Sequence, residues 1–128
     1  AQAAVIDALS DPQEAVARAA LSAVGPVQSP ALIEAIANVA RKSPSWPMRV
    51  RATEALGRLG VNAASQPLLD ALGAAARLDP YALVRESAAR ALAPLDPSVA
   101  GPLLRELAAS DAEPRVRATA AALVKNLR

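Results

Sequence analysis

Residues 79–92, with the sequence DPYALVRESAARAL, recur in weaker form three more times, and this recurrence constrains the fold more than any other feature. In each copy an Asp or Ser is followed, five positions later, by an apolar residue. These apolar anchors are Val16, Met48, Val84 and Val116. They are separated by about 32 to 36 residues, a period that is typical of repeat arrays and not of a single irregular domain.

Each copy has the pattern of a helix with one apolar side. After Val84, apolar residues follow at offsets of four, seven, eight and eleven, namely Ala88, Ala91, Leu92 and Leu95. This spacing places them on one side of a helix, so we expect Ala88 to be buried between helices. Asp79 is expected to cap the helix through its carboxylate. Pro80 suits the first helical position, because the amide that it lacks would have had no partner there.

A second apolar motif precedes every copy, so each repeat is predicted to be a pair of helices. The motif is VIDAL at residues 5–9, LIEAI at 32–36, LLDAL at 68–72 and LLREL at 103–107. Helix breakers between repeats are Gly25-Pro26, Gly60-Val61-Asn62 and Asp96-Pro97. The predicted helices span residues 2–10, 12–24, 30–42, 46–59, 63–77, 80–93, 97–109 and 113–127. No segment alternates with period two, so no sheet is expected.

One pair of helices cannot bury its apolar stripe alone, whereas stacked pairs form a continuous core. The predicted fold is therefore all-α, an α-α superhelix or solenoid of about four two-helix repeats. The repeats span about residues 1–26, 27–60, 61–95 and 96–128. The chain begins with Ala1 and Gln2, and we expect it to be part of a longer protein. Its first helix is almost entirely apolar, so we also expect weak self-association through exposed terminal repeats.

The pattern resembles HEAT repeats, and among them the short, Ala-rich bacterial type called PBS-lyase HEAT-like repeats. The resemblance is carried by Val84-Arg85 with Ala88 after Asp79-Pro80, and by the matching sets led by Met48-Arg49 and Val116-Arg117. It implies an armadillo-like, right-handed superhelix whose second helices line a concave face. It also implies a hydrogen-bonded ladder between neighbouring repeats, formed by Asp11, Asp79, Asp111, Arg49, Arg85 and Arg117. Ser43 and Ala17 depart from the Asp and Arg of that pattern.

Composition narrows the function. The chain has no His and no Cys, which removes the usual metal ligands, thiolate nucleophiles and imidazole bases, and it has no Gly-rich phosphate loop. We therefore predict a non-catalytic protein without a cofactor. Acidic and basic residues are nearly equal in number, so nucleic acid is not the expected partner. No signal segment or long apolar run is present, from which we predict a cytoplasmic location and no membrane contact.

The candidate binding residues are those of the types that dominate interface energies. They are Trp46, Tyr81, Arg51, Arg90 and Arg115. Trp46 and Tyr81 occupy nearly equivalent places in neighbouring repeats, and we expect them at the same edge. Arg51 and Arg115 are predicted to be the unpaired surface cations, and Arg51 is expected to point towards the groove. By contrast, Glu14–Arg18, Glu54–Arg58 and Glu86–Arg90 have the spacing of helix surface pairs.

The sequence predicts a protein-interaction or scaffolding module whose partner is a protein segment, or another domain of the same chain, that contacts the middle two repeats. Three alternatives stay open. The chain can be a structural spacer within a larger enzyme. It can handle a tetrapyrrole, as the bilin lyases that name the subtype do, although it offers no Cys or His to hold one. It can bind duplex DNA on a basic face, as some HEAT-like proteins do.

Overall fold

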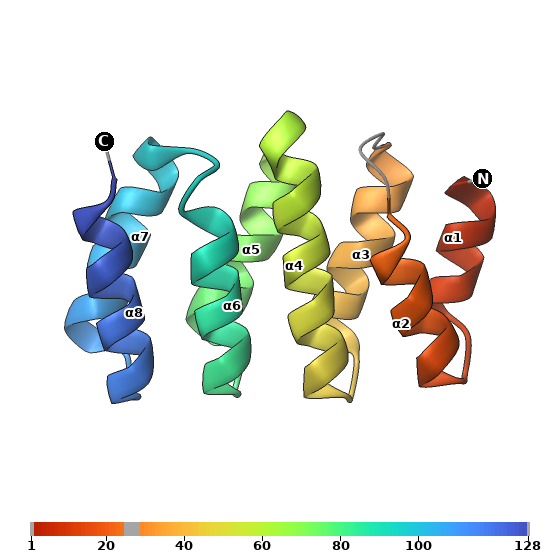
Figure 1. Cartoon of the computed structure of the whole chain (residues 1–128), viewed down its shortest axis with the longest axis horizontal. Helices are drawn as coiled ribbons and strands as arrows, with labels where there is room; N and C mark the ends of the chain where they lie inside the picture. The colour runs from red at the N-terminus through yellow and green to blue at the C-terminus, as the bar shows by residue number, and fades with distance from the viewer. Residues whose placement is uncertain (1, 25–28, 128) are drawn as a thin grey trace.

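The computed structural model describes residues 2–24 and 29–127, which form eight α-helices and no strand. The helices are α1 (Gln2–Leu9), α2 (Glu14–Ser22), α3 (Pro30–Lys42), α4 (Trp46–Asn62), α5 (Gln66–Leu78), α6 (Ala82–Leu92), α7 (Pro97–Ser110) and α8 (Pro114–Lys125). Odd-numbered helices form one layer and even-numbered helices the other, and successive pairs stand side by side in a row (Figure 1). This arrangement confirms the predicted all-α superhelix of helix pairs.

Packing joins neighbouring pairs along the row. In one layer α2 contacts α4, α4 contacts α6 and α6 contacts α8, while in the other α1 contacts α3 and α3 contacts α5. Such an array gains its stability from the packing within each repeat and from the interfaces between adjacent repeats. Within the described residues no helix is both long enough and apolar enough to cross a membrane.

The core consists of the apolar stripes that the repeat period predicts. Val84, Ala88 and Leu92 of α6 are fully buried, as is Val116 of α8. Val16 is the exception among the four anchors, because its side chain is 38% exposed whereas Met48 is 5% exposed and Val84 0%. It lies on α2, in the pair at one end of the row that the described residues form (Figure 1).

Small residues allow α4 and α6 to approach closely. A Cβ atom placed on Gly57 would lie only 2.9 Å from the Cβ atom of Ala91, closer than real side chains pack. Three residues further on, a Cβ atom on Gly60 would lie 2.6 Å from Cδ1 of Leu95. The two glycines therefore set the spacing between the second and third helix pairs.

The structure corrects two local predictions. Asp79 is not the residue that begins α6, which starts at Ala82; its Oδ1 instead accepts a hydrogen bond from the backbone N–H of Tyr81 at 2.9 Å, in an Asx turn before the helix. The expected break at Gly60-Val61-Asn62 is also wrong, because α4 continues to Asn62. Gly60 does not end the helix. Leu95 packs against the position where a Cβ atom would lie, so the glycine makes room for this side chain. The predicted break at Gly25-Pro26 lies outside the described residues.

Candidate functional site

Arginine–aspartate pairs connect successive helix pairs on the edge formed by the intra-pair turns. Nε of Arg49, on α4, donates to Oδ2 of Asp79 at 2.8 Å, and its Nη2 donates to Oδ1 of the same carboxylate at 3.3 Å. Arg85, on α6, contacts Asp111 in the same two-pronged way, at 2.9 and 3.0 Å. The carboxylates of Asp79 and Asp111 are buried, so these are paired charges withdrawn from water.

Each of these arginines also anchors its own turn. Nη1 of Arg85 donates to the backbone carbonyl of Asp79, and Nη1 of Arg49 donates to that of Ser43, at 2.9 and 2.8 Å. Arg117 makes the corresponding bond to the carbonyl of Asp111 at 2.6 Å. The result is a continuous series of hydrogen bonds from α4 to α8, in which Arg49 and Arg85 each join the turn of their own pair to the turn of the next.

The ion pair between Arg85 and Asp111 favours the charged forms of both side chains. The hydrogen bond from Arg85 holds the pKa of Asp111 below its ordinary value, and this effect outweighs the burial that would raise it. The same bond raises the pKa of Arg85. Both groups therefore remain ionised throughout the neutral range.

Between the first two helix pairs the chain of ion pairs is interrupted. Ala17 occupies the place of the arginine and is buried, and Ser43 occupies the place of the aspartate. The polar link at this junction lies elsewhere, where Nη2 of Arg58 on α4 donates to the carbonyl of Leu21 near the end of α2, at 2.9 Å. The predicted Glu54–Arg58 pair is absent from the described ion pairs, because the guanidinium of Arg58 is directed at α2 instead.

Glu86 on α6 makes a second polar link between neighbouring helix pairs. Its side chain is buried and accepts hydrogen bonds from Nε of Arg115 at 3.0 Å and from the hydroxyl of Thr119, both on α8. Arg90, one turn further along α6, lies 3.6 Å from the same carboxylate. Burial tends to raise the pKa of Glu86, but the bonds from Thr119 and Arg115, together with the positive charges of Arg115 and Arg90, outweigh it, and the pKa is lowered.

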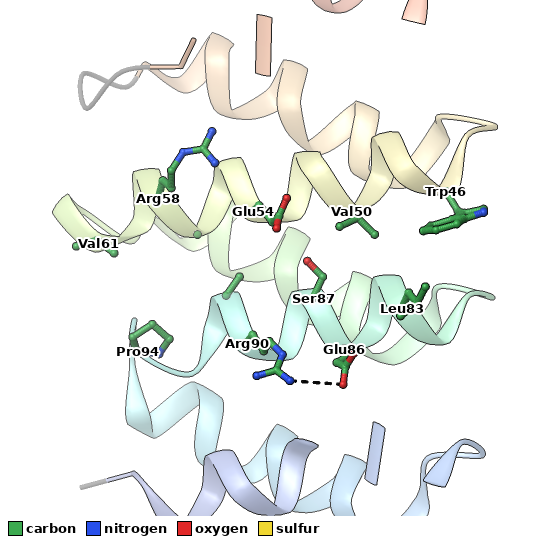
Figure 2. A pocket seen from close by; sticks show the side chains of 12 residues that line it. Trp46, Val50, Glu54, Arg58, Val61, Leu83, Glu86, Ser87, Arg90 and Pro94 are labelled. Carbon is green, nitrogen blue, oxygen red and sulfur yellow. Dashed lines mark ion pairs between the residues drawn. The ribbon is translucent and has the colours of Figure 1, made fainter. Parts of the chain in front are cut away.

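A groove of about 700 Å³ lies between α4 and α6, on the layer of even-numbered helices (Figure 2). Trp46, Val50 and Leu83 form its apolar end beside the turns. The middle is lined by charged residues, Glu54 and Arg58 from α4 and Glu86 and Arg90 from α6, and Gly57 and Ala91 form part of the lining where the two helices approach closely. In Figure 2 Arg58 points away from α6. Val61 and Pro94 lie at the other end (Figure 2).

The only two aromatic side chains of the protein meet beside this groove. The rings of Trp46 and Tyr81 are stacked, with centroids 5.6 Å apart and an angle of 16° between their planes. The guanidinium carbon of Arg49 lies 5.7 Å from the centroid of the Tyr81 ring, a cation–π distance. The stack thus spans the junction between the second and third helix pairs, and Tyr81 also contacts the arginine of the Arg49–Asp79 ion pair.

A larger cavity of about 920 Å³ lies between α3 and α5 in the other layer, lined by Ile33, Ala37, Ala71 and Ala74 among others. It is bordered by Ser29 and Pro30, which directly follow residues 25–28, so its full boundary is not defined by the described residues. It also contains none of the candidate binding residues. For these reasons we take the groove between α4 and α6 as the candidate site.

Comparison with known families identifies the repeat type. The description "HEAT repeats" matches residues 3–77, which is more than half of the chain. The protein belongs to the HEAT repeat family. HEAT repeats generally serve protein–protein interaction or scaffolding, and the family is typically non-catalytic. No curated protein and no solved structure matches the chain.

Of the five candidate binding residues, this HEAT array gathers three around the groove. Trp46 and Arg90 line it, and Tyr81 stacks behind Trp46. Arg51 is exposed on α4 but does not line the groove, so the expectation that it points there needs correcting. Arg115 is not the unpaired cation that was predicted, because it binds Glu86 across the α6–α8 interface.

Glu86 and Arg58 are the residues that sequence reasoning missed. Both were assigned to surface pairs within one helix, whereas each binds a neighbouring HEAT repeat. For Glu86 the available signal was spacing: Arg115 and Thr119 follow it by 29 and 33 residues, close to the repeat period. No group of three or more Asp or Glu residues suited to a metal ion occurs in residues 2–24 and 29–127.

Proposed function

We propose that this HEAT repeat protein is a non-catalytic interaction module that binds a segment of another protein, or of another domain of its own chain, in the groove between α4 and α6. The observation that carries the proposal is the gathering of Trp46, Tyr81 and Arg90 at this one groove. Tryptophan, tyrosine and arginine are the residue types in which interface energy concentrates.

The lining of the groove supports a peptide-like ligand. Apolar side chains at the Trp46 end can bury an apolar residue of the ligand. In the middle, the carboxylate of Glu54 can accept hydrogen bonds and the guanidinium of Arg90 can donate them. Arg90 is free to turn towards a ligand because Glu86 keeps two closer partners, Arg115 and Thr119. Mixed charge along the groove also disfavours duplex DNA, which is bound by faces of one sign.

The test uses a library of displayed random peptides selected on the wild-type chain. Binding of the selected peptides is then measured by calorimetry for the wild type, for Arg90→Gln and for Arg51→Gln. Both arginines are exposed, but only Arg90 lines the groove. We expect Arg90→Gln to weaken binding about tenfold, which corresponds to about 1.4 kcal/mol, while Arg51→Gln leaves the Kd unchanged.

Equal losses in the two variants would refute the groove as the site. Trp46→Ala adds a second probe and should abolish binding, provided that circular dichroism shows the same helix content as in the wild type. If no peptide is selected at all, the interaction function fails and the structural spacer within a larger enzyme becomes the better interpretation.

Assignment to the PBS-lyase HEAT-like subtype is a further part of the proposal. It rests on the short, Ala-rich repeats and on the Asp-Pro turns before α2 and α6, at Asp11-Pro12 and Asp79-Pro80. The subtype name does not bring a tetrapyrrole function with it, because the chain has neither Cys nor His to hold a bilin. An absorbance shift on addition of a bilin would contradict this part.

A further inference from the structure

The two ends of the row present the two halves of the contact that joins its inner repeats. Every inner junction from α4 to α8 pairs the arginine of one helix pair with the turn aspartate of the next. At the last pair, Arg117 bonds only the carbonyl of its own turn, and no carboxylate of the described residues lies within ion-pair distance of it. Its Nε and Nη2, which correspond to the groups that bind aspartate in Arg49 and Arg85, are left for another partner.

Asp11, at the first pair, is the matching half. Its Oδ1 accepts the N–H of Gln13 at 2.8 Å, in the same Asx turn that Asp79 and Asp111 form. Unlike those two aspartates, Asp11 has no arginine partner among the described ion pairs. The carboxylate is thus already oriented as it is in the inner turns.

The surface of α2, the helix that follows Asp11, also resembles the surface that α6 presents to α4 at an inner junction. Ala19 and Ala23 of α2 occupy the places that Ser87 and Ala91 hold on α6, where Ser87 bonds Thr53 at 2.7 Å and Ala91 meets Gly57. Both alanines are exposed, as is Val16, whose equivalents are buried under a neighbouring pair. On α8 the place of Thr53 is taken by the exposed Ala121.

We propose that a second copy of this chain docks head to tail, with α2 of one copy against α8 of the other and Asp11 of the first copy paired with Arg117 of the second. Opposite charges, small apolar side chains and continuity with the inner junctions all favour this occupant. Lys125 limits the affinity, because it stands on α8 where Gly57 stands on α4, and its long side chain must be displaced to the side. The interface is heterologous, so copies can add one after another without closing into a dimer.

Sedimentation velocity of the 128-residue chain over a range of concentrations tests the proposal. We expect the wild type to sediment faster as its concentration rises, and Asp11→Asn and Arg117→Gln each to remain monomeric. Asn retains the Asx turn, and circular dichroism checks that both variants keep their helix content. Arg51→Gln is the control, because Arg51 belongs to neither end.

Mixing the two variants gives the decisive result. In an equimolar mixture the Asp11→Asn variant keeps an intact Arg117 end and the Arg117→Gln variant keeps an intact Asp11 end, so the mixture should form dimers and nothing larger.

Lys125→Ala should strengthen association of the otherwise unchanged chain. A wild type that stays monomeric at several hundred micromolar overturns the proposal, and so does a mixture that stays monomeric. Association lost in Asp11→Asn but kept in Arg117→Gln overturns it in favour of a symmetric contact between two first pairs. The proposal does not rest on the groove between α4 and α6.

Discussion

At the scale of single residues, the turn aspartate determines how one repeat is joined to the next. Asp79 accepts the amide of Tyr81 within its own turn, receives the guanidinium of Arg49 from the preceding pair, and offers its carbonyl to Arg85. One side chain thus shapes a loop, neutralises a buried cation and connects two helices. Serine at position 43 accepts the amide of Ser45 through its hydroxyl and offers its carbonyl to Arg49, but it has no charge with which to neutralise a cation.

Removal of such an aspartate is expected to be costly. Asp79→Ala leaves the guanidinium of Arg49 buried without its counter-ion, and the loss of one partner of a buried pair costs about 3–5 kcal/mol. Glu106→Ala is the matched control, because Glu106 pairs with Arg77 at 2.7 Å but both side chains are about half exposed. That variant should lose no more than about 1 kcal/mol. Urea unfolding followed by circular dichroism measures both, and similar losses would contradict the role of burial.

Acid sensitivity follows from the second buried pair, Arg85–Asp111. The pKa of Asp111 is lower in the folded chain than its ordinary value of 3.8, so the unfolded chain takes up protons first as the pH falls. The contribution of the pair to stability is complete above the unfolded-state pKa and is lost as the pH falls through the folded-state pKa. Asp111→Asn should therefore flatten the decline in unfolding free energy below about pH 5. Urea titrations at successive pH values measure this slope, and an unchanged slope would contradict the prediction.

At the scale of elements, glycines decide how closely the helices of one layer pack. Gly57 faces Ala91 across the α4–α6 interface, whereas Gly73 of α5 has no atom within 4 Å of the place where a Cβ would be. Two residues of the same type, each inside a helix, therefore have different reasons to be there. One is required by its neighbour, and the other only weakens its helix.

The two glycines make a matched pair of substitutions. Gly73→Ala should stabilise the protein by about 0.5–1 kcal/mol, because alanine is the better helix former and no neighbour resists it. Gly57→Ala gains the same propensity but must push apart two helices, and overpacking costs about 1–3 kcal/mol. Thermal unfolding should therefore give a higher Tm for Gly73→Ala than for Gly57→Ala. The reverse order would mean that the α4–α6 spacing is not set at Gly57.

Sequence reasoning succeeded where a property repeats with the helical or repeat period. The stripe of Val84, Ala88 and Leu92 and the order of the helix pairs are of this kind. It failed where one side chain can reach more than one hydrogen-bond partner. Nothing in the sequence shows that Arg58 prefers the carbonyl of Leu21 to the nearby Glu54, or that Glu86 is buried, because both depend on how two repeats face each other.

At the scale of the whole molecule, the junctions are unequal. Ion pairs with buried carboxylates reinforce the junctions from α4 to α8, while the junction between α2 and α4 has only the bond from Arg58 to a backbone carbonyl among its described side-chain links. In an array stabilised by interfaces between neighbours, the weakest junction opens first.

Amide hydrogen exchange tests this order. We expect the amides of α2 to exchange faster than those of α6, at equal temperature and pH, because α2 can separate without breaking an arginine–aspartate pair. Ala17→Arg combined with Ser43→Asp would place the missing pair at this junction. If that double substitution folds, it should slow exchange in α2. Uniform protection across all helices would instead indicate a single cooperative unit.

The stacked rings of Trp46 and Tyr81 give the molecule a built-in optical reporter. The protein has one tryptophan, one tyrosine and no phenylalanine, so all of its ultraviolet emission comes from a single point between the second and third helix pairs. The fluorescence of Trp46 therefore records the opening of that junction alone, whereas the far-ultraviolet signal averages over every helix. When the end of the array unravels first, the two signals separate along the denaturation curve, and the gap between them measures how far the repeats behave as independent units.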